Sequence, residues 1–331
     1  MKIIFFSAQA YDKTFFNRYN DTLGFELDFQ ESQLTEQTVG LVNNAEAICV
    51  FVNDQINAVV CKQLSEKGVK VIALRCAGFN NVDLEAAKAN GLRICRVPAY
   101  SPEAVAEHAL ALILTLNRKT HKAYNRVREQ NFSLNGLLGF NLYGKTVGVI
   151  GTGNIGKSFC RIMKGLGCRV LAFDVIANKD MESIGVEYHP LAEVLAADII
   201  SLHCPLNNQT KHLINPETIG MMKKGAMLIN TSRGGLVDTK AITEALKSGQ
   251  VGYLGIDVYE QEEHLFFRDL SGVIIQDDEI QRLMSFPNVL ITAHQAFFTE
   301  EALSQIATNT LNSTYELLKS NKLSNQAALL V

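Results

Sequence analysis

The sequence has no excess of charge of either sign and no long hydrophobic run. It holds 31 Lys and Arg against 34 Asp and Glu, for a formal net charge of −3. A protein that binds a nucleic-acid backbone needs a surplus of basic residues, so this balance argues against such a partner. The longest strongly apolar helical stretch, Ala109 to Leu116, is far shorter than the roughly 20 residues that span a bilayer. We therefore expect neither a nucleic-acid partner nor a membrane.

Cysteines in metal-binding or disulfide patterns are also missing. The seven cysteines are odd in number and scattered, and none is spaced Cys-x-x-Cys. This pattern argues against a disulfide framework and a zinc site, and it predicts reduced, mostly buried thiols and no metal. The N-terminus has one positive charge and a short apolar run that ends before Gln9, which is typical of an opening strand rather than a signal peptide. A cytoplasmic protein is expected.

The chain does contain a long alternation of short apolar runs and helical patterns. Such alternation indicates βαβ units and parallel sheets. Strands are predicted at 2–6, 47–52, 70–74, 146–150, 169–173, 199–203, 226–230, 253–258 and 289–292. Helices are predicted near 57–67 and 83–89, from Pro102 to about Gln130, and from about Thr299 to Leu318.

The length of 331 residues favours about two domains. A glycine turn typical of nucleotide domains begins only at Gly151, so about 100 residues precede that domain. We predict two doubly wound parallel-sheet domains, with a Rossmann NAD-binding domain (100–298) inserted in a flavodoxin-like substrate domain (1–99 plus 299–331). The chain would cross twice between them, which predicts a hinge and an interdomain cleft for a small molecule.

The glycine turn carries the spacing of a dinucleotide site. Gly151, Gly153 and Gly156 follow an apolar strand and precede a helix, a context that makes the motif specific. The first glycine permits the tight turn, the second lets the backbone approach a pyrophosphate, and the third lets helix and strand pack closely. Asn154 and Ile155 belong to the same loop and are expected to contribute mainly their backbone.

An acidic residue stands where a ribose contact is expected. Asp174 lies 18 residues past Gly156, just after the strand at 169–173. A carboxylate there hydrogen-bonds the adenine ribose and repels a 2′-phosphate. No arginine lies between Asp174 and the next strand, and Lys179 is alone. The sequence therefore predicts NAD rather than NADP.

Three polar residues lie at or just beyond strand ends of the second domain, where ligands of doubly wound sheets collect. Arg233 sits in the glycine-bearing turn 230–235, where a guanidinium could pair bidentately with a carboxylate. His294 precedes the apolar segment 295–298 and is our candidate acid/base. Glu262 lies in an acidic loop. Each residue alone also fits a surface or core role, but together they supply a substrate anchor, a proton donor and a partner that keeps the donor charged.

Several segments resemble the D-isomer-specific 2-hydroxyacid dehydrogenase family, and most closely its bacterial fermentative D-lactate branch. The resemblance covers the whole chain. Its most specific pieces are Arg75 to Asp83, Val97 to Pro102, Ile199 to Leu206, Asn230 to Gly234, Asp257 to Glu260 and His294 to Phe297.

The resemblance implies a full set of site residues. Catalysis falls on Arg233, Glu262 and His294. Contacts with the nicotinamide and ribose fall on Cys204, Pro205, Thr210, Thr231, Ser232, Arg233 and Asp257. Substrate contacts fall on Ala77, Gly78, Tyr100, Arg233, His294 and Phe297, with Arg75 and Phe298 supporting them.

The implied reaction is reversible hydride transfer from NADH to pyruvate, giving D-lactate. Arg233 would bind the carboxylate and polarise the carbonyl, and protonated His294 would deliver the proton. Glu262 would raise the pKa of His294. The resemblance also implies a homodimer or homotetramer, with a dimerisation arm at 131–143. Two alternatives stay open: a relative that acts on a larger 2-keto acid, and a non-catalytic NAD-sensing module.

Overall fold

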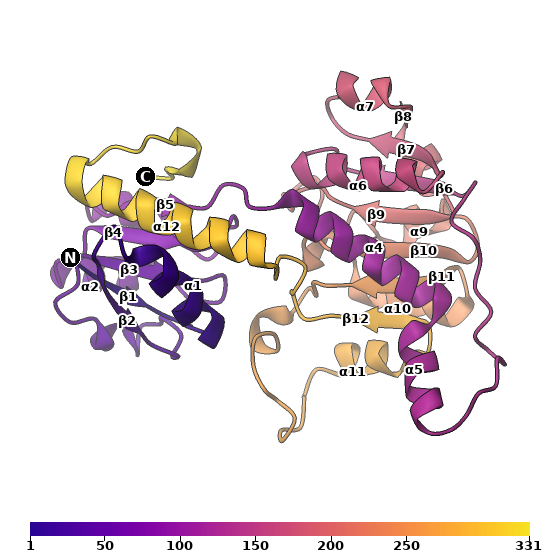
Figure 1. The fold of residues 1–331 in the computed structure, drawn as a ribbon, viewed down its shortest axis with the longest axis horizontal. Helices are drawn as coiled ribbons and strands as arrows, with labels where there is room; N and C mark the ends of the chain where they lie inside the picture. The colour runs from indigo at the N-terminus through magenta and orange to yellow at the C-terminus, as the bar shows by residue number, and fades with distance from the viewer. The chain divides into compact units, whose positions relative to one another are not determined.

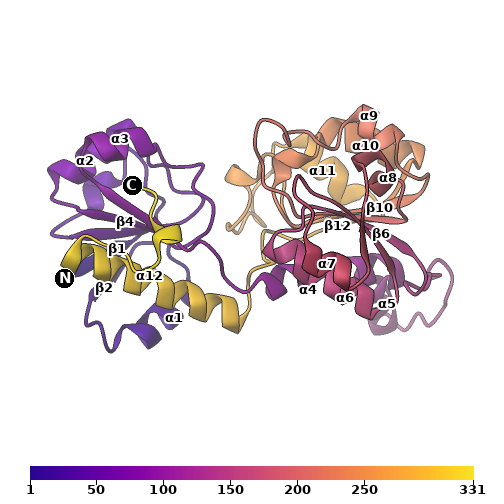
Figure 2. The same cartoon turned by 90° about the horizontal axis from the view of Figure 1, so that it is seen from above.

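The computed structural model describes residues 1–331, except for the side chain of His264. The chain divides into two compact units, which Figures 1 and 2 show from two directions. Unit 1 is Met1–Ser101 with Phe298–Val331, and unit 2 is Pro102–Phe297. These limits differ by one or two residues from the domain boundaries expected from the sequence.

Unit 1 is built on a parallel sheet with the strand order β2-β1-β3-β4-β5. This is the flavodoxin-like doubly wound order. Its strands are β1 (Lys2–Phe5), β2 (Glu26–Phe29), β3 (Ala47–Val50), β4 (Val71–Leu74) and β5 (Arg93–Arg96). Its helices are α1 (Ala10–Asn20), η1 (Val39–Leu41), α2 (Ala58–Glu66), α3 (Leu84–Ala89), α12 (Glu300–Ser320) and η4 (Gln326–Ala328).

The C-terminal helix belongs to unit 1. Helix α12 packs against α1, β4 and β5, and it buries Ile306, Leu311 and Leu317. Beyond it, the N–H of Leu330 donates to the carbonyl of Ile94 in β5 at 2.9 Å. The core strands β3 and β4 are buried along their whole length, as expected for a parallel sheet covered on both faces.

Unit 2 is built on a larger parallel sheet with the order β12-β11-β10-β9-β6-β7-β8. Counted from β6, this is the Rossmann order with one further strand. Its strands are β6 (Thr146–Ile150), β7 (Arg169–Phe173), β8 (Val186–Tyr188), β9 (Ile199–Leu202), β10 (Ala226–Asn230), β11 (Val251–Ile256) and β12 (Val289–Ile291).

Helices and short 3-10 turns connect these strands (Figure 1). They are α4 (Pro102–Arg118), α5 (Thr120–Arg128), α6 (Asn154–Gly165), α7 (Lys179–Ser183), α8 (Leu191–Leu195), α9 (Pro216–Gly220), η2 (Gly234–Leu236), α10 (Thr239–Ser248), η3 (Glu262–His264) and α11 (Asp278–Ser285). None of the described helices is long and apolar enough to cross a membrane. All seven cysteines are buried as free thiols.

The single helix predicted from Pro102 to about Gln130 was wrong. Helix α4 ends at Arg118 and α5 begins at Thr120, because Lys119 between them has a left-handed backbone with φ of 51°. The two helices also differ in environment, since α4 is amphipathic and largely buried on one face whereas α5 buries no residue. No proline or glycine marks the break in the sequence.

Three strands were not predicted, and all three lie at sheet edges. Strands β2 and β5 are the edges of the first sheet, and β8 is an edge of the second. Edge strands have one neighbour and are less buried, so their apolar pattern is weak. Strand β2 carries Glu26 and Asp28, and β5 has an arginine at each end.

Candidate active site

The glycine turn between β6 and α6 has the geometry of a dinucleotide loop. Gly151 has φ of 93°, and a Cβ built there would lie 2.6 Å from the backbone nitrogen of Cys204. A Cβ on Gly156 would lie 2.0 Å from the carbonyl oxygen of Gly151, whereas a Cβ on Gly153 would meet nothing within 4 Å. The outer two glycines therefore allow close backbone packing, and the middle one borders open space that a pyrophosphate could occupy.

The N-terminus of α6 adds hydrogen-bond donors to this turn. The helix begins at Asn154. Its N-cap residue is Gly153, which has no side chain to cap the first N–H groups of the helix. Its first N–H groups carry partial positive charge and suit an anion. The residues present thus fit a bound pyrophosphate.

Asp174 lies at the carboxyl end of β7, next to the glycine turn. Its Oδ2 accepts hydrogen bonds from the N–H and the hydroxyl of Thr152 at 2.5 and 3.0 Å, and its Oδ1 accepts the N–H of Ile176 at 3.3 Å. Burial alone would raise the pKa of Asp174, but the hydrogen bonds from Thr152, Ile176 and Val175 together outweigh burial, and the pKa lies below its usual value. Asp174 is therefore an anion with acceptor capacity beside the loop.

His294 and Glu262 form a direct pair. The Nδ1 atom of His294 lies 2.8 Å from Oε1 of Glu262, and the other carboxylate oxygen accepts the N–H of Tyr259 at 2.8 Å. Both side chains are about one-fifth exposed, at 18% and 24%. Because a carboxylate only accepts, Nδ1 carries the hydrogen in this contact and Nε2 is left for other chemistry.

A buried carboxylate fixes the segment that carries His294. Asp257 is fully buried, and its oxygens accept hydrogen bonds from the Thr292 hydroxyl (2.5 Å) and from the N–H groups of Gln295 and Ala296 (2.9 Å each). Its carbonyl accepts the N–H of His294 at 2.7 Å. Burial would raise the pKa of Asp257, but the interactions with His108, Thr292 and the N–H of Ala296 together outweigh burial and lower the pKa. In unit 2 Asp257 thus acts as an anchor, and its predicted nicotinamide contact stays a prediction.

The turn after β10 places Arg233 next to the loop after β11. The guanidinium donates from Nη1 to the carbonyl of Ser232 at 2.7 Å. A Cβ on Gly234 would lie 2.0 Å from the carbonyl carbon of Tyr259, so the two backbones are in contact. Thr231 Oγ1 is buried and has no hydrogen-bond partner among the described residues.

The loop after β9 carries the remaining predicted cofactor residues. The carbonyl of Cys204 accepts the Ser232 hydroxyl at 2.6 Å, and the Thr210 hydroxyl donates to the carbonyl of Pro205 at 2.6 Å. Burial raises the pKa of the Cys204 thiol to about 11, so it is not a reactive thiolate. These loops follow the neighbouring strands β9, β10, β11 and β12 at their carboxyl ends, the edge where doubly wound sheets bind ligands.

The predicted substrate residues divide between the two units. Ala77, Gly78 and Tyr100 lie in unit 1, and Phe297 is buried at the end of unit 2. The carbonyl of Ala77 accepts Nη1 of Arg96 at 2.8 Å, and the carbonyl of Gly78 accepts the Cys76 thiol at 3.3 Å. These two hydrogen bonds, accepted by backbone carbonyls, hold the segment 76–78 in place.

Two residues near His294 were missed by the sequence interpretation. His108 Nε2 lies 3.0 Å from the Thr292 hydroxyl and 3.4 Å from Asp257, although it is far away in sequence. The ring of Phe267 lies 5.8 Å from that of His294, and Phe267 has a left-handed backbone with φ of 63°. No local motif indicates either contact, because each depends on chain segments that meet only after folding.

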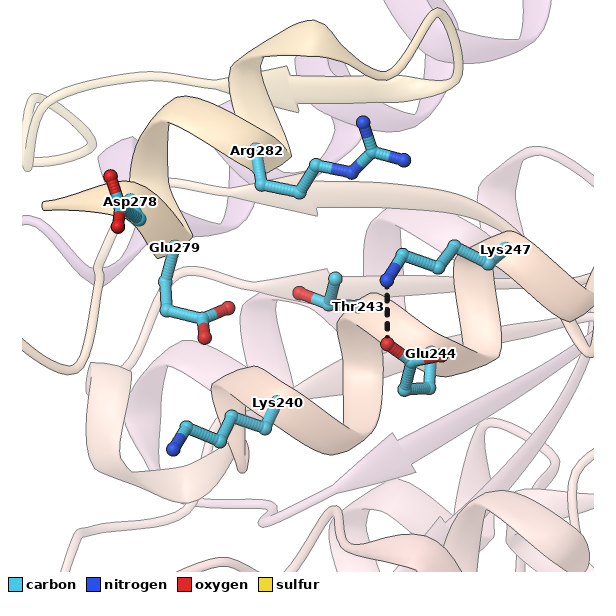
Figure 3. Close-up of a pocket in the computed structure, with 7 residues that line it drawn as sticks. All are labelled: Lys240, Thr243, Glu244, Lys247, Asp278, Glu279 and Arg282. Atoms are coloured by element: carbon cyan, nitrogen blue, oxygen red, sulfur yellow. Dashed lines mark hydrogen bonds and ion pairs between the residues drawn. The ribbon is translucent and has the colours of Figure 1, made fainter.

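Two hollows in unit 2 lie outside the predicted site. An apolar cavity of about 610 Å³ is lined by parts of 265–293 together with His121 and Lys122. A second hollow of about 570 Å³ lies between α10 and α11, and Figure 3 shows its charged lining. It combines three cations with three carboxylates and Thr243, and includes the ion pair Lys247–Glu244 at 2.6 Å. Its balanced charge gives no preference for an anionic ligand.

Comparisons with known proteins match this architecture. Residues 110–296 match the family model described as D-isomer specific 2-hydroxyacid dehydrogenase, NAD binding domain. The chain is 54% identical over 323 residues to 2-hydroxyacid dehydrogenase homolog 1 of Schizosaccharomyces pombe, with 97% of each chain covered. The chain belongs to this family. Unit 2 is its NAD-binding domain.

Two further relatives are similar over nearly the whole length. The D-lactate dehydrogenase of Escherichia coli is 51% identical over 327 residues, which cover 98% of this chain and 99% of the relative. The structure of the pyruvate reductase of Chlamydomonas reinhardtii matches with a TM-score of 0.94 at 47% identity, covering 98% of each chain. Family membership and the doubly wound fold expected from the sequence are confirmed.

Proposed function

We propose that this dehydrogenase reduces pyruvate to D-lactate with NADH and catalyses the reverse reaction with NAD. The observation that carries the proposal is the His294–Glu262 pair at the ligand-binding edge of an NAD-binding domain. The pair lies after β11 and β12, and the Arg233 turn follows the neighbouring strand β10. The substrate is supported by the full-length relatives named D-lactate dehydrogenase and pyruvate reductase.

The glycine turn and its surroundings would hold the cofactor. Gly153 and the first N–H groups of α6 would receive the pyrophosphate, and Asp174 the adenine ribose. The buried Thr231 hydroxyl and the loop containing Cys204, Pro205 and Thr210 would face the nicotinamide half. Bound NADH supplies the hydride for the carbonyl carbon of the substrate.

Arg233 and His294 would act on the substrate itself. The guanidinium of Arg233 binds the carboxylate of a 2-keto acid in bidentate geometry and polarises its carbonyl. His294 donates a proton from Nε2 to the carbonyl oxygen as that oxygen gains charge. Such proton transfer from a positioned side chain is worth about 10² to 10⁴ in rate.

Glu262 would keep His294 ready for this step. Its carboxylate accepts from Nδ1, which fixes the orientation of the ring and directs Nε2 away from Glu262. Asp257 would hold the segment 292–296 in place beneath it.

The experiment that tests the function is oxidation of NADH with a panel of 2-keto acids, followed by chiral analysis of the product. We expect pyruvate to be reduced efficiently and the product to be the D-isomer. Faster turnover of a bulkier 2-keto acid would favour the alternative of a larger substrate. No turnover with any 2-keto acid, while NADH still binds, would favour a non-catalytic NAD-sensing module.

We also propose a homodimer or homotetramer that works in the cytoplasm. An association surface is supported by exposed apolar side chains on α5 and the following segment, namely Tyr124, Val127, Phe132, Leu134, Leu138 and Tyr143. The seven buried free thiols suit a reducing compartment. Light scattering coupled to size-exclusion chromatography and cell fractionation test these two statements, and a monomer or a secreted protein would contradict them.

A further inference from the structure

A second histidine–glutamate pair lies next to the one that holds His294. His212 Nε2 lies 2.6 Å from Oε1 of Glu260, and Oε2 of Glu260 accepts the hydroxyl of Thr239 at 3.0 Å. Glu260 and Glu262 are two residues apart, and each binds a different imidazole. Because a carboxylate only accepts, Nε2 of His212 carries the hydrogen in this contact.

The three members of this cluster come from three different connections. His212 lies in the loop after β9, which also carries Cys204 and Thr210. Thr239 begins α10, directly after the turn that carries Arg233. Glu260 lies in the loop after β11, which also carries Glu262. One carboxylate therefore joins the three connections that hold most of the predicted cofactor and catalytic residues of unit 2.

Other contacts draw the same connections together around this carboxylate. The N–H of His212 donates to the carbonyl of Gly235 at 2.8 Å. A Cβ on Gly234 would lie 2.3 Å from the backbone nitrogen of Glu260, so the Arg233 turn rests directly on the chain at Glu260. A change in the position of Glu260 would therefore be transmitted to the Arg233 turn and to Glu262.

His212 is held in a strained conformation. Its φ is 51°, in the left-handed region that is unfavourable for a residue with a Cβ. Its carbonyl accepts the side-chain amide of Asn215 at 3.0 Å, and its ring is bound by Glu260, so both backbone and ring are fixed. Strained residues fixed in this way concentrate at functional sites.

We propose that Glu260 and His212 are positioning residues, and that their hydrogen-bonded pair fixes the loop after β9 and the Arg233 turn in the arrangement that binds NADH and the substrate carboxylate. The pair acts through Arg233, Thr210 and Glu262 and touches no reacting atom. The inference rests on the proposed function for its turnover measurements but not for its binding measurements.

A double-mutant cycle tests the pair. We would compare Glu260→Ala, His212→Ala and the double variant by titrating each protein with NADH in the absence of substrate, because a glutamine at either position could still make the hydrogen bond. Each single variant should weaken NADH binding about tenfold, which corresponds to about 1.4 kcal/mol. The double variant should bind no more weakly than the worse single variant, because either change breaks the same contact.

Steady-state kinetics with pyruvate then separate positioning from catalysis. We expect the KM for pyruvate to rise with the Kd for NADH, while kcat at saturation changes by less than about threefold. A loss of kcat with unchanged KM and Kd would overturn a positioning role. Unchanged NADH affinity, or single effects that add in the double variant, would overturn the coupling.

Two further variants guard against a purely structural effect. Glu193→Ala removes a carboxylate from the exposed pair between Glu193 on α8 and His189 just before that helix, 2.7 Å apart, and it should leave NADH affinity unchanged. Thr239→Val removes only the hydroxyl that binds Glu260, and it should weaken NADH binding about threefold even if Glu260→Ala fails to fold. Wild-type protein that binds NADH without reducing pyruvate would overturn the proposed substrate, while the titrations would still decide the role of the pair.

Discussion

The imidazole of His294 is oriented by Glu262, and the carboxylate of Glu262 is itself fixed by the backbone N–H of Tyr259. The ring can therefore present Nε2 to a substrate without a change of tautomer.

Glu262→Gln should lower kcat/KM for pyruvate by about 10- to 100-fold, because a neutral amide holds the N–H of Nδ1 more weakly than a carboxylate and orients the ring less firmly. Steady-state kinetics with pyruvate check this, with the Kd for NADH as the control. An unchanged kcat/KM would show that the carboxylate does not support the proton donor.

Arg233→Lys should raise the KM for pyruvate by about 10- to 100-fold, because an ammonium group cannot reproduce the bidentate contact with a carboxylate. The Kd for NADH, measured by fluorescence titration, serves as the control and should change far less. His294→Ala should instead lose most of kcat. If both variants changed KM and kcat in the same way, Arg233 and His294 would not divide substrate binding and proton transfer between them.

Gly156→Ala and Gly153→Ala form a matched pair. The first would place a Cβ 2.0 Å from the carbonyl oxygen of Gly151 and should destabilise the fold by several kcal/mol, whereas the second meets open space and should fold normally. Gly153→Ala should nevertheless weaken NADH binding at least about tenfold, because its methyl group intrudes where the backbone meets the pyrophosphate. Thermal unfolding and NADH titration check both. Normal NADH affinity in Gly153→Ala would contradict the placement of the pyrophosphate.

Asp174→Ala should reduce the preference for NADH over NADPH by at least about tenfold, because the carboxylate that repels a 2′-phosphate is gone. Thr152 loses a partner in this variant. Asp174→Asn is therefore the control, since its amide oxygen can still accept from Thr152. An unaltered preference in both variants would show that the ribose contact lies elsewhere.

His203 should make the protein less stable in acid. Its side chain is partly buried, its ring centroid lies 4.9 Å from that of Phe159, and Nε2 lies 2.9 Å from the Ser201 hydroxyl; burial lowers the pKa of His203 to about 3. The unfolded chain has the ordinary histidine pKa near 6.5 and takes up the proton first, so stability is full above pH 6.5 and falls as the pH drops towards 3. At pH 5.5 the loss should be about 1.4 kcal/mol.

Urea unfolding of wild type and His203→Gln at pH 7.5 and pH 5.5 measures this loss. The wild type should lose more stability between the two pH values than the variant, and all other titrating groups cancel in the comparison. Equal losses would show that His203 does not remain neutral in the folded protein.

The sequence alone determined where the main strands and the cofactor-binding turn lie along the chain. The strand at 146–150, the glycines after it and Asp174 are local features, because a tight turn and a helix N-terminus are formed by neighbouring residues. For the same reason the parallel strands of the sheet interiors, with their continuous apolar runs, were predictable, whereas the polar edge strands β2, β5 and β8 were not.

Tertiary structure decided which polar side chains meet. His294 binds Glu262 across 32 positions, and His212 binds Glu260 across 48, and each contact exists because sheet pairing brings distant loops to one edge. Nothing local distinguishes Glu260 from Glu262, yet they bind different histidines. The break at Lys119 and the anchoring role of Asp257 likewise depend on what packs around them. Local backbone geometry could be inferred from neighbouring residues, but side-chain partnership required the folded chain.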